Sequence, residues 1–101
     1  MIACAHESDL VRLELNNAVF QHPLFALDKA HQLGVLATLR KLSALRWPQV
    51  YPDRGLNWEL IHSRIGPGGH RLYSLRISQG FRVVAYRDGG GWLRMLSLHP
   101  D

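Results

Sequence analysis

Residues 72–87 read LYSLRISQGFRVVAYR, and this stretch decides the fold of the 101-residue chain. Apolar and polar side chains alternate on both sides of the central SQG, which is typical of two strands that each bury one face. Glycine at the end of such a loop tolerates the left-handed conformation that a three-residue hairpin loop requires. The pattern therefore predicts an antiparallel hairpin in which Ile77 opposes Phe81. On its other face Arg76 lies opposite Arg82.

A third strand is predicted at residues 92–99 (WLRMLSLH), after the turn-like DGGG segment. A four-residue loop there extends the apolar face to Leu96, and we expect the helical part of the chain to pack on this face. Arg82 then lies across from Ser97. Arg94 is left on the apolar side, where only its stem can pack while the guanidinium reaches outward. The polar face gathers four side chains: Arg76, Arg82, Ser97 and His99.

The segment before this meander predicts one strand and one or two helices. Residues 10–16 alternate apolar and polar side chains, as a half-buried strand does. A helix is expected over residues 29–46, with Asp28 as its N-cap and Pro48 ending it, because a residue before proline avoids the helical region. Gly34 is a weak position and leaves open a hairpin of two shorter helices. Four leucines form the expected apolar side: Leu36, Leu39, Leu42 and Leu45.

Prolines and glycines mark the connections. Pro23 is expected to interrupt regular structure, and residues 47–55 to form a loop that leads into an extended segment at residues 56–61. The order of strand, helix or helices, and strand meander predicts the α+β class. A chain of this length builds one core, so residues 1–101 are expected to form a single domain.

Basic side chains dominate the second half of the chain. The formal net charge is +4, and ten of the twelve basic residues are arginines. An arginine fork binds two phosphate oxygens at once, so this composition favours a polyanionic partner. Two opposed arginines repel each other unless an anion lies between them, although a single strand arginine more often only keeps a sheet soluble. Seven arginines follow residue 50: Arg54, Arg64, Arg71, Arg76, Arg82, Arg87 and Arg94.

Several classes of protein do not fit the composition. Cys4 is the only cysteine, so the chain cannot close an internal disulfide, and no Cys/His spacing predicts a zinc site. Residues 1–5 are too short for a membrane span and lack the basic flank of a signal sequence. We therefore expect a cytoplasmic protein with no cofactor, no metal and no membrane contact. Four aromatic residues could stack on bases, although packing is the commoner role: Trp47, Trp58, Tyr73 and Trp92.

Three strand motifs resemble the last strands of the RelE/ParE superfamily of bacterial toxin-antitoxin toxins. They are LYSLRI (72–77), FRVV (81–84) and MLSLH (95–99). The order of elements is similar as well, and the resemblance is clear over roughly residues 56–101. It implies the RelE-like fold and a toxin that is neutralised by a cognate antitoxin.

Within that superfamily, the YoeB-like branch cleaves messenger RNA, and its pattern implies roles for residues of this chain. The glutamate before the first meander strand corresponds to Glu59, the arginine of the second strand to Arg82, and the terminal histidine to His99. Arg76 matches a further strand arginine of that branch. The tyrosine that follows the histidine in that branch has no counterpart, because Pro100 follows His99 here.

RNA cleavage without a metal needs a base for the 2′-hydroxyl, an acid for the leaving 5′-oxygen and cations for the phosphoryl oxygens. Glu59 suits the base, His99 the acid, and Arg82 with Arg76 the anion clamp. A lone glutamate more often neutralises a nearby arginine, and a histidine near a chain end more often frays. Further phosphate contacts are expected from two more arginines: Arg64 and Arg71.

The resemblance implies an endoribonuclease toxin that acts on messenger RNA at the ribosome. Its antitoxin is expected to cover the arginine-bearing face and an exposed sheet edge, since such edges invite strand addition. Two alternatives stay open. The first is a ParE-like toxin, which would poison DNA gyrase without needing Glu59 or His99. The second is an inactive protein of the toxin fold that only binds partners, an alternative favoured because Pro100 stands where the tyrosine would follow His99. A homodimer is compatible with each of these readings.

Overall fold

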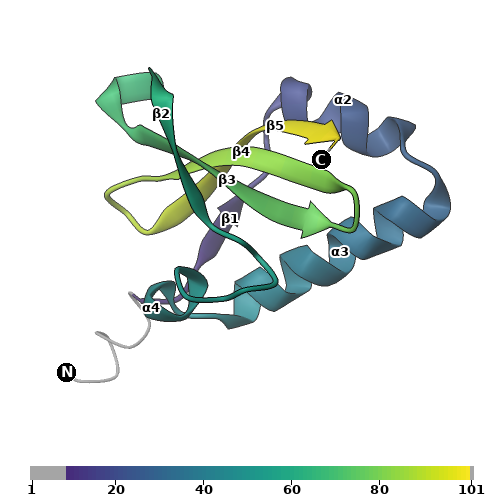
Figure 1. Cartoon of the computed structure of the whole chain (residues 1–101), viewed down its shortest axis with the longest axis horizontal. Coiled ribbons are helices and arrows are strands. Elements are labelled where there is room, and N and C mark those ends of the chain that lie inside the picture. The colour runs from purple at the N-terminus through teal and green to yellow at the C-terminus, as the bar shows by residue number, and fades with distance from the viewer. Residues whose placement is uncertain (1–8, 101) are drawn as a thin grey trace.

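A computed structural model describes residues 9–100 of the chain (Figure 1), so the expectations for Cys4 and for residues 1–5 lie outside the described part. The elements follow in this order: β1 (Arg12–Glu14), α2 (Ala18–Ala26), α3 (Lys29–Ala44), α4 (Trp47–Val50), β2 (Glu59–Ile65), the 3-10 turn η1 (Pro67–Gly69), β3 (Arg71–Ser78), β4 (Phe81–Arg87) and β5 (Trp92–Pro100). The predicted α+β class is confirmed: a strand, two helices and then an antiparallel meander.

One sheet of five strands carries the whole fold, in the order β1-β5-β4-β3-β2. Neighbouring strands from β2 to β5 are antiparallel, as short connections require. The first strand pairs in parallel with the last one, with Leu13 opposite Leu93. Such a pair needs a long crossover, and here α2 and α3 lie in the connecting chain (Figure 1). Among residues 9–100, no helix is long and apolar enough to cross a membrane.

The core lies between the helices and one face of the meander. Leu75, Ile77 and Val83 are fully buried on that face, as predicted, and belong to one apolar cluster with residues of α3. The buried positions of α3 are Val35, Leu39 and Leu42. Burial of this surface is the main force that holds helix and sheet together.

The predicted apolar side of the main helix was wrong at one position. Leu36 is 56% exposed, and Val35 is fully buried instead. The reason is the close approach of α3 to the end of β3: a Cβ added at Gly34 would lie 3.2 Å from the Cβ of Ser78. Glycine lets the backbones come together there, which turns Val35 into the core and leaves Leu36 facing out.

Two expectations about proline were also wrong. Pro23 lies inside α2, where the lost hydrogen bond is offset by packing, because Phe20 is fully buried in the core. Pro48 does not end α3, because α3 already stops at Ala44. Pro48 instead occupies the first turn of α4, where a backbone N–H has no helical partner to lose.

The two helices are separated at Leu27 and not at Gly34, the position that the sequence had left open.

The N-cap prediction for α3 is confirmed, and a second contact ties the two helices together. The side chain of Asp28 accepts a hydrogen bond of 2.9 Å from the backbone N–H of His31. The side-chain amide of Gln32 donates to the carbonyls of Leu24 and Phe25, each at 3.2 Å. Those carbonyls lie in the last turn of α2, where helical partners run out.

The predicted register of the first hairpin is confirmed over most of its length. Arg76 opposes Arg82, and Gly80 has the left-handed φ of 88°. Phe81, however, pairs with Ser78 and not with Ile77. The extra residue forms a bulge beside the turn, a common site for one.

The predicted register between the last two strands was wrong by two residues. Arg82 lies opposite His99, not Ser97, for two reasons. The turn leaves five residues between the paired Arg87 and Leu93 and not four, and β5 contains one extra residue where the register shifts between Val84 and Ala85. This bulge also explains Arg94, which the unbroken alternation had placed on the apolar side. Leu93 and Met95 are buried instead, and Leu96 is only half-buried.

Candidate functional site

The uncovered face of the meander brings together polar side chains from four strands. Two neighbouring rows cross it: Arg76, Arg82 and His99 in one, and Glu59, Ser74, Val84 and Ser97 in the other. We call this surface the arginine face and define it by Glu59, Ser74, Arg76, Arg82, Ser97 and His99. It lies opposite the face that carries Leu75 and Val83. The prediction that Arg82 lies on the face away from the helices is therefore confirmed.

Arg82 is the central side chain of this face, and its guanidinium is held from one side. Its Nε and Nη2 both donate to the hydroxyl of Ser74, at 3.1 and 2.6 Å. Nη2 also donates to the backbone carbonyl of Asn57 at 3.1 Å. The side chain is only 18% exposed. These bonds fix the orientation of the guanidinium and use its Nε and Nη2 donors, which leaves Nη1 as the nitrogen that can meet an anion.

Glu59 lies beside this guanidinium. One of its carboxylate oxygens is 3.7 Å from Nη2 of Arg82, and its side chain is 59% exposed. An ion pair this long and this exposed contributes little to stability. Glu59 therefore lies beside Arg82 and is accessible from solvent.

His99 completes the row from the other side. Its Nε2 is 2.7 Å from the hydroxyl of Ser97, two residues earlier on the same strand. The contact orients the ring of an otherwise exposed residue. His99 and Glu59 thus flank Arg82 from β5 and β2, with β4 between them.

The structure places Arg64 and Arg71 elsewhere. Both line a pocket with His62 near the far end of the β2–β3 hairpin. Arg71 is five residues from Arg76 along β3, or about 16 Å at the usual rise of a strand. By strand alternation it also points to the other face of the sheet. These two arginines are therefore not part of the arginine face.

The sequence interpretation missed Ser74 and Asn57. Ser74 belongs to the quoted strand motif, and its place beside Arg82 follows from the hairpin register that was predicted correctly. Asn57 carries no such signal, since it precedes β2 in a turn, with a left-handed φ of 49°. Asparagine is one of the few residues other than glycine that tolerate this conformation.

The aromatic residues next to Asn57 pack on one another. Trp47 is 1% exposed and donates a hydrogen bond of 3.0 Å from its indole to the carbonyl of Gly91. Trp58 stacks on Tyr73 with ring centroids 4.7 Å apart, and its ring also lies 6.0 Å from that of Trp47. Packing is thus the role of Trp47, as the sequence favoured. This cluster supports the turn from which Asn57 reaches Arg82.

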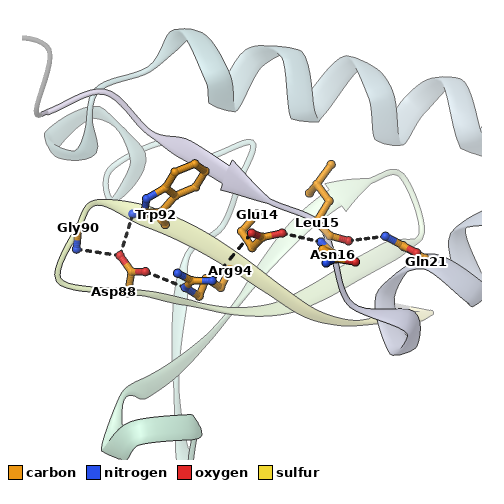
Figure 2. Close-up of polar contacts among 8 residues, drawn as sticks. All are labelled: Glu14, Leu15, Asn16, Gln21, Asp88, Gly90, Trp92 and Arg94. Atoms are coloured by element: carbon orange, nitrogen blue, oxygen red, sulfur yellow. Dashed lines mark hydrogen bonds and ion pairs between the residues drawn. The ribbon is translucent and has the colours of Figure 1, made fainter.

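A second polar network joins the turn between β4 and β5 to β1 (Figure 2). Asp88 accepts hydrogen bonds from the backbone N–H groups of Gly90 and Trp92, at 2.8 and 3.0 Å, and from Nε of Arg94 at 2.7 Å. Arg94 also lies 3.9 Å from the carboxylate of Glu14. Partial burial acts to raise the pKa of Asp88, but the hydrogen bonds from Arg94 and the backbone outweigh it and hold this pKa below its usual value.

We expect Asp88→Asn to lower the free energy of unfolding by about 1–2 kcal/mol at pH 7, because the charged partner of Arg94 is lost. The folded-state pKa is lowered, so the carboxylate stabilises the fold above its unfolded pKa and loses this effect as the pH falls. The difference between variant and wild type should therefore shrink below about pH 4. Urea unfolding at pH 7 and pH 3 measures it, with Glu14→Gln as the control for the longer contact. An equal difference at both pH values would contradict this account.

Comparison with protein-family models, with characterised proteins and with solved structures finds no match to this chain. The RelE/ParE superfamily therefore stays a resemblance carried by the strand motifs. Within residues 9–100, no group of three His, Cys, Asp or Glu side chains is placed to hold a metal ion.

Proposed function

We propose that this protein is the toxin of a toxin-antitoxin system and a metal-independent endoribonuclease that cleaves messenger RNA at the ribosome. The observation that carries the proposal is the row Arg76, Arg82 and His99, with Glu59 at 3.7 Å from Arg82. The row and the neighbouring Glu59 together offer two cations, an acid and a base on one accessible face. The likeness of the strand motifs to RelE/ParE toxins points the same way.

In this mechanism Glu59 accepts the proton of a ribose 2′-hydroxyl, and the 2′-oxygen attacks the neighbouring phosphorus. Arg82 and Arg76 stabilise the charge that grows on the phosphoryl oxygens. The bond from phosphorus to the 5′-oxygen then breaks, and His99 donates a proton to that oxygen. The products are a 2′,3′-cyclic phosphate and a free 5′-hydroxyl, so every proton and bond is accounted for.

In the YoeB-like branch a tyrosine follows the terminal histidine, and in this mechanism Ser97 takes over the positioning of His99. Pro100 follows His99, and the Ser97 hydroxyl at 2.7 Å is the group that orients the histidine ring. A cognate antitoxin would neutralise the protein by covering Arg82 and pairing with β2, the edge strand next to β3. The proposed partners are messenger RNA bound to the ribosome and this antitoxin.

A second candidate is a binding module of the same fold that does not cut RNA. Its support is the arrangement of Arg82 itself, whose Nε and Nη2 already bond to Ser74 and Asn57 and whose Nη2 lies near Glu59. Such contacts also occur where an arginine only braces neighbouring strands. Cleavage activity separates the two candidates.

We expect the purified protein to cut ribosome-bound messenger RNA and leave 2′,3′-cyclic phosphate ends. His99→Ala should reduce the rate by about 10- to 100-fold, at or below the usual range for a general acid, because water can also reach an exposed leaving group. His22→Ala, an exposed histidine on α2, is the matched control and should cut like the wild type. Wild-type protein that inhibits gyrase and cuts no RNA would overturn the proposal in favour of a ParE-like toxin.

A further inference from the structure

A stacked pair of rings lies on the same side of the sheet as Arg82, beyond the arginine face. The rings of His70 and Tyr86 have centroids 4.9 Å apart and planes 18° from parallel. Both residues are half-buried, so the pair is neither part of the core nor loose in solvent. The mechanism proposed above uses neither of them.

The position of Tyr86 relative to Arg82 follows from the strand. Alternation along β4 is unbroken, with Val83 and Ala85 buried, so Arg82, Val84 and Tyr86 share the uncovered side. Tyr86 is four residues from Arg82, which is about 13 Å along a strand. Half-buried Val84 lies between them as an apolar floor. A short stretch of extended nucleic acid strand spans this distance.

The charge beside Tyr86 is already neutralised. Its cross-strand neighbour is Arg94, whose guanidinium lies 2.7 Å from Asp88 and 3.9 Å from Glu14 (Figure 2). The two ends of the surface therefore differ. The end at Arg82 attracts a phosphate through its positive charge. The end at Tyr86 presents an aromatic ring to a base, and the nearby charge of Arg94 is neutralised there.

We propose that Tyr86, backed by His70, is a base-stacking subsite for single-stranded RNA whose phosphate lies at Arg82. Base stacking on aromatic rings tolerates any base, and it requires a base that is free of a duplex. Because the two rings already stack on each other and are half-buried, the platform is formed before RNA binds. The subsite rests on the proposed RNA-cleaving function, and it adds the residue that sets the direction of the strand along β4.

The test is binding of a labelled single-stranded oligoribonucleotide of roughly ten nucleotides, followed by fluorescence anisotropy. Tyr86→Ala should weaken binding by about 5- to 100-fold, the usual effect of losing one stacked base. Tyr86→Phe keeps the ring and should stay within about threefold of the wild type. Phe25→Ala removes a ring that is 71% exposed on α2 and should have no effect. His70→Ala, which removes only the supporting ring, should give an intermediate loss.

The same variants distinguish this subsite from the nuclease itself. In cleavage assays Tyr86→Ala should raise KM and leave kcat close to that of the wild type, because the ring binds RNA away from the reacting phosphate. Protein that binds RNA through Tyr86 and cuts none would refute the nuclease and keep the subsite. Unchanged RNA binding by folded Tyr86→Ala or His70→Ala, or equal binding of a duplex, would overturn the subsite alone.

Discussion

Replacing Arg82 by alanine is expected to lower RNA cleavage by about 10²- to 10³-fold and to abolish detectable toxicity, because it removes a fixed donor from a developing anion. The guanidinium is held by Ser74 and by the carbonyl of Asn57, so its charge is in place before the reaction begins. The fold should survive, since the side chain points away from the core. Cleavage of ribosome-bound messenger RNA gives the rate, and circular dichroism reports the fold.

Two further variants sharpen this experiment. Arg40→Ala removes the same charge from an exposed position of α3 and should cut like the wild type. Arg82→Lys keeps the positive charge but loses the planar fork, so it should recover only part of the rate. Full toxicity in a folded Arg82→Ala protein would show that the arginine face is not the active site.

The largest effect on stability is expected at Trp47. Trp47→Ala should lower the free energy of unfolding by about 3–5 kcal/mol, as the loss of a fully buried aromatic side chain does. The indole joins α4 to the turn before β5 through its bond to Gly91, and the guanidinium of Arg87 lies 4.5 Å from its ring. Such a loss is a large share of the stability of a domain this small. Urea unfolding followed by circular dichroism measures it.

A milder change at the same position separates packing from hydrogen bonding. Trp47→Phe keeps much of the ring but loses the bond to Gly91, so it should cost clearly less than the alanine change. A free energy of unfolding within 1 kcal/mol of the wild type for Trp47→Ala would contradict the burial argument.

Only part of the arrangement of the arginine face could be predicted from the sequence. The pairing of Arg76 with Arg82 follows from alternating residues and from Gly80, since a short hairpin leaves few registers that keep the apolar side chains together. The pairing of Arg82 with His99 did not follow. The turn before β5 is one residue longer than expected, and the bulge in β5 shifts the strand by one more. Leu96 and Leu98 look equally apolar in the sequence although only Leu98 is buried.

The sequence by itself determined the local features: the α+β class, the Asp28 cap, the first hairpin and the placement of Arg76 and Arg82 on the face opposite the apolar side chains. Each depends on residues close together in the chain, where periodicity and turn chemistry leave few choices. Tertiary structure alone decided the parallel pairing of β1 with β5 and the helix through Pro23. It also decided which row of the sheet holds His99 and which end holds Arg71. Those outcomes depend on packing between segments far apart in sequence, which no local pattern records.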